Sequence, residues 1–174
     1  LAAHTLGYTQ LITENEFSKL SERGYKLIDR IGRKGIEAAF ESELRGKWGG
    51  EMLEIDSMGT VQRSLGLKIP KAGKDIKLTL DLDLQLTAEK VLSDKVAGAI
   101  VAIDPRTGAI RAIASKPTFD LNFFSQPFTN KQYDDLFLSS NLPLLSRAFN
   151  AYDPGSTWKP VTAMAGMESG KFPA

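Results

Sequence analysis

Two apolar runs joined by a tight-turn sequence constrain the fold of this chain more than any other feature. Residues 97–103 are rich in alanine, valine and isoleucine, which is typical of a buried strand. Residues 104–108 (DPRTG) have turn composition, and residues 109–115 predict the returning strand. Such an apolar hairpin exposes unpaired edges unless further chain covers it. Because helical patterns occur elsewhere, we predict an α+β fold.

Before this hairpin, the chain predicts several short elements. Residues 1–12 mix β-forming side chains with glycine and predict a strand that ends near residues 7–9. Thr13 and Glu16 have the spacing of a capping box, which predicts a short helix over residues 13–23. Apolar residues at helical spacing predict a second helix over residues 36–44.

A second hairpin is predicted from alternating residues 52–56 and 60–65. Residues 66–74 are predicted to form a linker, because Pro70 and Gly73 interrupt regular secondary structure. We therefore predict one domain over residues 1–70 and another over residues 71–174.

The second domain opens with alternating leucines that predict a strand through Leu80, followed by a helix over residues 83–93 with an aspartate cap. Residues 117–145 show no sustained period and predict a long loop, of a length that is usually functional or mobile.

Composition excludes several classes of function. The chain of 174 residues has a net charge of +1 and no dominant basic block, which argues against nucleic-acid binding. It contains no cysteine, so a thiol nucleophile and a thiolate metal site are excluded. Two aspartate pairs, Asp81 with Asp83 and Asp134 with Asp135, lack convergent partners in sequence. We therefore expect no metal and no cofactor.

Ser156 and Lys159 are the candidate catalytic residues. Residues three apart share one helix face, with Cβ atoms about 5–6 Å apart. A serine becomes a nucleophile only when a base takes its proton, and a lysine becomes that base only when burial or a neighbouring cation lowers its pKa. Tyr152, Trp158 and Val161 could supply the apolar wall. The alternative is a helix-capping serine followed by a surface lysine.

Pro160 complicates the local structure, because a proline inside an α-helix removes a hydrogen bond and crowds the preceding turn. Regular α-helix should therefore begin near Thr157, or the serine turn should be 3₁₀. The single histidine, His4, lies far from Ser156 in sequence, so a Ser-His-Asp triad is disfavoured and lysine is the better candidate base.

Several stretches together resemble the class B penicillin-binding proteins of the elongation type. They are residues 4–8 (HTLGY), 31–37 (IGRKGIE), 44–46 (LRG), 99–115, 117–122 (PTFDLN), 143–148 (PLLSRA) and 154–160 (PGSTWKP). Several weak motifs in the right order are jointly specific. The resemblance implies a non-catalytic pedestal or dimerisation domain over residues 1–70, and the start of a transpeptidase domain with a serine β-lactamase-like fold over residues 71–174.

The same resemblance implies a chemistry and a setting. Ser156 would attack the D-Ala-D-Ala amide of a peptidoglycan stem peptide, Lys159 would take its proton, and β-lactams would acylate Ser156. Implied partners are a membrane glycosyltransferase and cell-shape proteins. The implied location is the periplasmic face of the bacterial inner membrane, with an anchor outside this chain.

The chain departs from the family pattern after Lys159. The family completes its site with Ser-x-Asn and with Lys-Thr-Gly or Lys-Ser-Gly, and neither follows Lys159 here. The chain opens at Leu1 in mid-pattern, and we expect it to be part of a longer protein and to be inactive alone. Two alternatives stay open: a non-catalytic interaction module and a β-lactam sensor.

Overall fold

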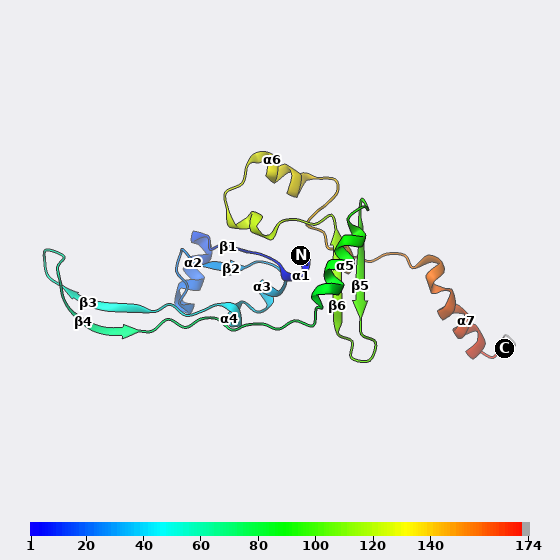
Figure 1. The fold of residues 1–174 in the computed structure, drawn as a ribbon, viewed down its shortest axis with the longest axis horizontal. Helices are drawn as coiled ribbons and strands as arrows, with labels where there is room; N and C mark the ends of the chain where they lie inside the picture. The colour runs from blue at the N-terminus through cyan, green and yellow to red at the C-terminus, as the bar shows by residue number, and fades with distance from the viewer. Residues whose placement is uncertain (172–174) are drawn as a thin grey trace.

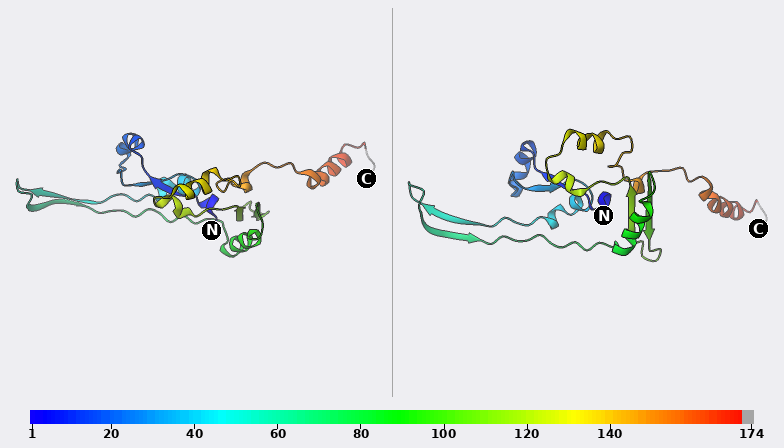
Figure 2. Two further views of the ribbon diagram at one scale, coloured as in Figure 1. Left: turned by 90° about the horizontal axis from the view of Figure 1, so that it is seen from above. Right: turned by 45° about the horizontal axis from the view of Figure 1, so that its top comes forward.

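The computed structural model describes residues 1–171 of this chain. The molecule is elongated: the hairpin of β3 (Gly50–Ile55) and β4 (Val61–Lys68) extends from one end, and helix α7 (Lys159–Glu168) extends from the other (Figures 1 and 2). The expected mixture of helices and strands is confirmed. None of the helices within residues 1–171 has both the length and the hydropathy to cross a membrane.

The N-terminal region is a set of short elements around a two-stranded sheet. These are α1 (Ala3–Leu6), β1 (Thr9–Leu11), α2 (Glu14–Leu20), η1 (Ser21–Arg23), β2 (Arg30–Gly32), α3 (Gly35–Ala39) and α4 (Glu41–Leu44). Strand β1 pairs antiparallel with β2, with Gln10 opposite Ile31. The prediction of a strand that ends near residues 7–9 was wrong. Helix α1 lies before those residues, and strand β1 begins only at Thr9, where β2 is available as a partner.

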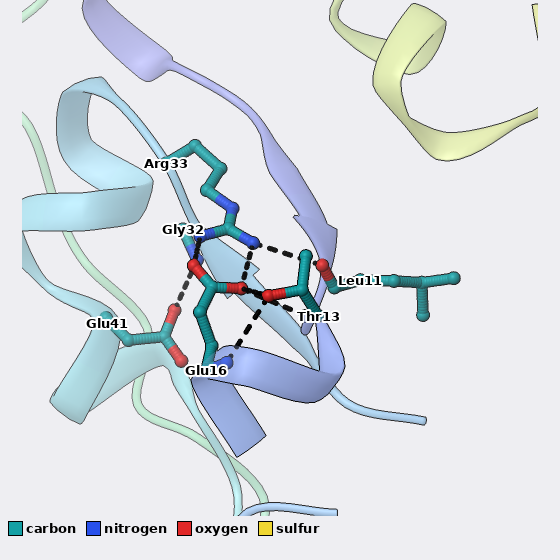
Figure 3. A network of polar contacts seen from close by, with 6 residues as sticks. All are labelled: Leu11, Thr13, Glu16, Gly32, Arg33 and Glu41. Atoms are coloured by element: carbon teal, nitrogen blue, oxygen red, sulfur yellow. Dashed lines mark hydrogen bonds and ion pairs between the residues drawn. The ribbon is translucent and has the colours of Figure 1, made fainter. Parts of the chain in front are cut away.

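The two predicted helices of this region have different outcomes. The capping box at Thr13 is confirmed, with the Glu16 N–H bonded to the Thr13 hydroxyl and the Thr13 N–H bonded to the Glu16 carboxylate. The helix predicted over residues 36–44 is broken at Phe40, whose φ of −114° leaves helical geometry. Beyond the break, the Glu41 carboxylate accepts the N–H of Gly32 at 2.8 Å (Figure 3).

Two glycines bring α1 and α3 into backbone contact. Gly7 and Gly35 have φ of +79° and +63°, in the region that glycine alone adopts freely. A Cβ added at Gly7 would lie 1.8 Å from the Lys34 carbonyl oxygen, and one at Gly35 would lie 2.3 Å from that of Thr5. The connection between these helices therefore requires glycine at both positions.

The predicted β3–β4 hairpin is confirmed and is longer than its pattern indicated. β3 pairs antiparallel with β4 from Gly50 opposite Lys68 to Ile55 opposite Val61, with two register shifts. All residues of both strands are exposed. The predicted linker begins inside β4, and Lys71 then forms an isolated bridge with Lys47.

The strand predicted through Leu80 was wrong. Residues 75–80 pair with no strand in the described part of the chain. Only isolated hydrogen bonds connect this region to the hairpin over residues 98–116. The Thr79 hydroxyl donates to the Ile110 carbonyl oxygen, and the Asp81 N–H donates to that of Arg111. Alternating leucines therefore do not form a strand here, because no neighbouring strand supplies a ladder.

Helix α5 (Leu82–Leu92) covers the hairpin of β5 (Gly98–Ile103) and β6 (Ile110–Lys116), and both the helix and this hairpin are confirmed. Asp81 caps the helix through the Leu84 N–H. A small core joins α5 to the strands, with Ala88, Leu92, Ala112 and Ala114 buried and Ile100 and Ala102 packed against them. This core is the apolar cover that the hairpin requires.

A buried glutamine completes one edge of this hairpin. Gln85 is only 1% exposed; its amide nitrogen donates to the Ile113 carbonyl oxygen at 3.0 Å, and its amide oxygen accepts the Ile113 N–H at 2.8 Å. The side chain thus replaces a neighbouring strand along β6. Within the described residues, β5 pairs only with β6.

The predicted long loop contains short helical turns. They are η2 (Leu121–Ser125), α6 (Asn130–Tyr133), η3 (Asp134–Leu138) and η4 (Arg147–Phe149). Phe124 stacks on Tyr8 with ring centroids 3.5 Å apart, and its carbonyl oxygen accepts the Arg30 guanidinium at 2.8 Å. These contacts join the loop to the N-terminal sheet. Its mobility stays a prediction.

Candidate active site

Ser156 and Lys159 lie at the junction of two helical segments. Ser156 is in the 3₁₀ turn η5 (Gly155–Trp158), and Lys159 is the first residue of α7. The Lys159 N–H donates to the Ser156 carbonyl oxygen. The structure therefore takes the predicted 3₁₀ alternative, and α-helix begins at Lys159 rather than near Thr157. Pro160 sits in the first turn of α7, where a missing N–H is tolerated.

The turn is closed by its own residues. The Pro154 carbonyl oxygen accepts the Thr157 N–H at 3.2 Å and the Thr157 hydroxyl at 2.5 Å. Gly155 has a φ of +55°, which glycine adopts without a Cβ penalty. The sequence Pro-Gly-Ser-Thr therefore forms a compact turn that carries the Ser156 side chain.

The site is open in this chain. Ser156 and Lys159 are both exposed, and α7 extends away from the other elements (Figure 1). Tyr152, Trp158 and Val161 are 63%, 55% and 47% exposed, so they do not form the expected apolar wall around the lysine. A lysine base needs burial or a neighbouring cation, and Lys159 lacks burial in this chain.

The chain that enters the site is anchored by Arg147. Its N–H donates to the Ser115 hydroxyl at 2.9 Å, and its guanidinium donates to the carbonyl oxygens of Asn141 at 2.8 Å and Leu142 at 3.3 Å. These bonds hold η4 beside β6. Sequence reasoning missed these roles, because neither Ser115 nor Arg147 has a local pattern that shows its partner.

A hollow of about 420 Å³ lies beside β5, between the hairpin and the chain that leads to Ser156. Gly98, Val101, Arg147 and Tyr152 contribute to its lining. His4 is directed elsewhere: its Nε2 lies 2.8 Å from the Pro143 carbonyl oxygen, which agrees with the argument against a histidine triad. Among residues 1–171, no cluster of three or more histidine, cysteine or acidic residues could hold a metal.

Two family descriptions match this chain in succession. Residues 1–78 match the penicillin-binding protein dimerisation domain, and residues 98–174 match the penicillin-binding protein transpeptidase domain. Between them they account for most of the sequence.

Curated relatives carry related names. The Acinetobacter baumannii peptidoglycan D,D-transpeptidase MrdA is 40% identical over 98% of this chain and 25% of its own length. The Escherichia coli K12 protein of the same name is 38% identical over 96% of this chain and 27% of its own length. Penicillin-binding protein 3 of Bacillus subtilis is 34% identical over 99% of this chain and 25% of its own length. The chain thus spans about a quarter of the length of these relatives.

Solved structures show the same fold. A peptidoglycan synthase complex that coordinates polymerization and crosslinking matches with a TM-score of 0.79 and 36% identity, over 98% of this chain and 32% of that one. Helicobacter pylori PBP2, solved in complex with MreC, matches with a TM-score of 0.79 and 28% identity, over 97% and 31%. Pseudomonas aeruginosa PBP2, solved in complex with WCK 5153, matches with a TM-score of 0.75 and 38% identity, over 97% of this chain and 33% of that one.

The order of elements, the Pro-Gly-Ser-x-x-Lys turn and the two matched domains agree with one another. The chain therefore belongs to the penicillin-binding proteins, and carries dimerisation-domain sequence followed by part of a transpeptidase domain.

Proposed function

We propose that this chain is part of a peptidoglycan D,D-transpeptidase of cell-wall elongation, with Ser156 as nucleophile and Lys159 as general base. The observation that carries the proposal is the Ser156–Lys159 pair, with Ser156 in the 3₁₀ turn η5 and Lys159 at the start of α7, within the region that matches a transpeptidase domain. Residues 1–70 would form the non-catalytic domain, and residues 71–174 the opening of the catalytic one.

The reaction follows from the two side chains. Ser156 Oγ bonds to the carbonyl carbon of the penultimate D-Ala, and its proton passes to Lys159 Nζ. The amide C–N bond then breaks, and the terminal D-Ala leaves with a proton. An amine of a neighbouring stem peptide attacks the resulting ester, which forms the cross-link and frees the Ser156 hydroxyl. A β-lactam acylates the same oxygen and is released slowly.

Several further properties belong to this proposal. The protein acts on the periplasmic face of the bacterial inner membrane, held by an anchor outside this chain. Its partners are a membrane glycosyltransferase and cell-shape proteins, in keeping with the solved relatives in a peptidoglycan synthase complex and in complex with MreC. The exposure of Ser156 and Lys159 favours one alternative, a non-catalytic interaction module.

Labelling with a fluorescent penicillin tests the proposal in the full-length protein that contains this chain. The adduct is digested and mapped by mass spectrometry, and we expect it on Ser156. Ser156→Ala should abolish the label. Ser169→Ala, at the other end of α7, should keep it. The 174-residue chain alone should label slowly or not at all, because no Ser-x-Asn follows Lys159 in it and it contains no Lys-Thr-Gly or Lys-Ser-Gly. A label that persists in Ser156→Ala would refute the assignment and leave the interaction module.

A further inference from the structure

Two strained residues flank one contact between distant parts of the chain. Ala2 and Leu142 have φ of +48° and +47°, and among residues 1–171 they are the non-glycine residues with positive φ. Between them, His4 Nε2 lies 2.8 Å from the Pro143 carbonyl oxygen. A side-chain-bearing residue keeps such a backbone only where its surroundings over-determine it, and such residues gather at switch and positioning sites.

Each strained residue is held by polar bonds. The Ala2 N–H donates to the Glu89 carboxylate at 2.6 Å. At Leu142, the Arg147 guanidinium donates to the carbonyl oxygens of Asn141 and Leu142. These bonds close the segment just before η4 into a compact loop. The His4 contact joins these two sets of bonds. It links α1, in the region that matches the dimerisation domain, to the chain that leads into Ser156.

His4 sits in surroundings that favour its neutral form. The ring is partly buried and lies edge-on to Phe119, with centroids 5.1 Å apart. Burial lowers the pKa of His4 below its usual 6.5; the bond to Pro143 raises it, and the nearby cations Arg147 and Lys34 lower it further. The net direction is down. Because the Pro143 carbonyl oxygen can only accept, His4 donates Nε2–H to it.

The charges around α1 come from several elements. Lys34 precedes α3 and Arg147 belongs to η4. The elements packed against α1 also carry charges, Glu37 on α3 and Arg111 and Lys116 on β6, while Glu89 of α5 is bonded to the Ala2 N–H. The cations that act on His4, Arg147 and Lys34, both oppose its protonation.

We propose that His4 is a positioning residue for the acylation segment, residues 139–159: its Nε2–H holds the Pro143 carbonyl oxygen and thereby fixes the path of the chain into Ser156. Low pH favours opening of this contact, because opening releases the ring from partial burial against Phe119 and from the cations Arg147 and Lys34. The proposal rests on the proposed function only in taking Ser156 as the reacting group. While the contact is formed, burial and the two cations lower the pKa of His4 more than the bond to Pro143 raises it. The formed contact is therefore favoured above the usual pKa of 6.5, and its opening becomes easier as pH falls below that value.

Hydrogen exchange in the full-length protein tests the contact without using Ser156. The reporters are the amides of Leu142, Leu145, Arg147 and Phe149, which are bonded within this segment or to Ser115. Protection factors, corrected for intrinsic exchange, are compared with those of the β5–β6 ladder at pH 7.5 and 5.5. We expect segment protection in the wild type to fall about three- to tenfold at the lower pH, and the ladder to stay constant.

Two substitutions separate positioning from general stability. His4→Gln keeps a donor that can reach Pro143 but does not titrate, so the segment should stay protected at both pH values. His4→Ala should lose protection about three- to tenfold at both. The proposal is overturned if wild type and His4→Gln show the same pH course, or if His4→Ala keeps its protection.

Penicillin acylation then tests whether the contact reaches Ser156. The rate should follow segment protection across the three proteins, with His4→Gln near wild type at pH 7.5 and His4→Ala slower. If the His4 substitutions change hydrogen exchange of the segment but leave the acylation rate unchanged, His4 stabilises only the loop, and a positioning role toward Ser156 is contradicted. Loss of acylation in every protein, wild type included, would instead count against the proposed function, and exchange would still decide the contact.

Discussion

Arg33 joins separate parts of the N-terminal region through a single guanidinium. It donates to the Leu11 carbonyl oxygen at 3.1 Å and to the Glu16 carboxylate through two nitrogens (Figure 3). Glu16 in turn closes the capping box with Thr13. The bond from Arg33, followed by those from Thr13, holds the pKa of Glu16 well below its usual value of 4.5. The pair therefore fastens α2 to β1.

Glu16→Gln should lower the midpoint of thermal unfolding at pH 7. Because the folded pKa of Glu16 is depressed, its carboxylate stabilises the fold above pH 4.5, and this contribution is lost as pH falls below 4.5. The difference between wild type and variant should therefore shrink in that range. Glu14→Gln, in the same first turn, is the control for the helix dipole. Equal effects of the two substitutions at pH 7 would contradict a specific role for the Arg33 pair.

At the scale of elements, the crossing of α1 and α3 depends on backbone that only glycine can provide. Gly7 has both a positive φ and a neighbouring carbonyl where a Cβ would lie. Gly59, in the β3–β4 turn, has a similar φ of +82° with open space around it. The two glycines thus separate the cost of backbone conformation from the cost of a steric clash.

Gly59→Ala should reduce the free energy of unfolding by about 1–2 kcal/mol, the cost of a left-handed conformation for a residue with a Cβ. Gly7→Ala should cost several kcal/mol, because it adds a clash with the Lys34 carbonyl oxygen that only backbone movement relieves. Urea denaturation of both variants measures the difference. Similar losses for the two would show that α1 and α3 can separate without harm.

The elements that sequence patterns predicted well are those with local causes. Both hairpins and the Thr13 capping box depend on neighbouring residues, and all were found. Helix α1 and the break at Phe40 depend on contacts between distant residues, and no local pattern shows them. The alternation before Leu80 was misleading for the same reason, since a strand needs a partner strand. Gln85, which completes the β6 edge, reads in sequence as an ordinary helical residue.

At the scale of the whole molecule, the sequence identified the Ser156–Lys159 pair but not its surroundings. The spacing of the pair and the effect of Pro160 are local, and the 3₁₀ turn agrees with them. The apolar wall was expected from flanking residues, yet those side chains are exposed and α7 lies apart from the rest. A site assembled from distant segments cannot be built from one stretch of sequence. The catalytic roles stay a proposal.

Lys159 is the proposed base for Ser156, and one substitution in the full-length protein tests this role. Lys159→Arg keeps the positive charge, but arginine does not release its proton and so cannot accept one from Ser156. Lys171→Arg is the matched control, and thermal melting confirms that both variants fold. The measurement is the second-order rate constant for acylation by one β-lactam. We expect a loss well above tenfold for Lys159→Arg and little change for Lys171→Arg. A loss below about tenfold, roughly 1.4 kcal/mol of barrier, would contradict the role of Lys159 as the base.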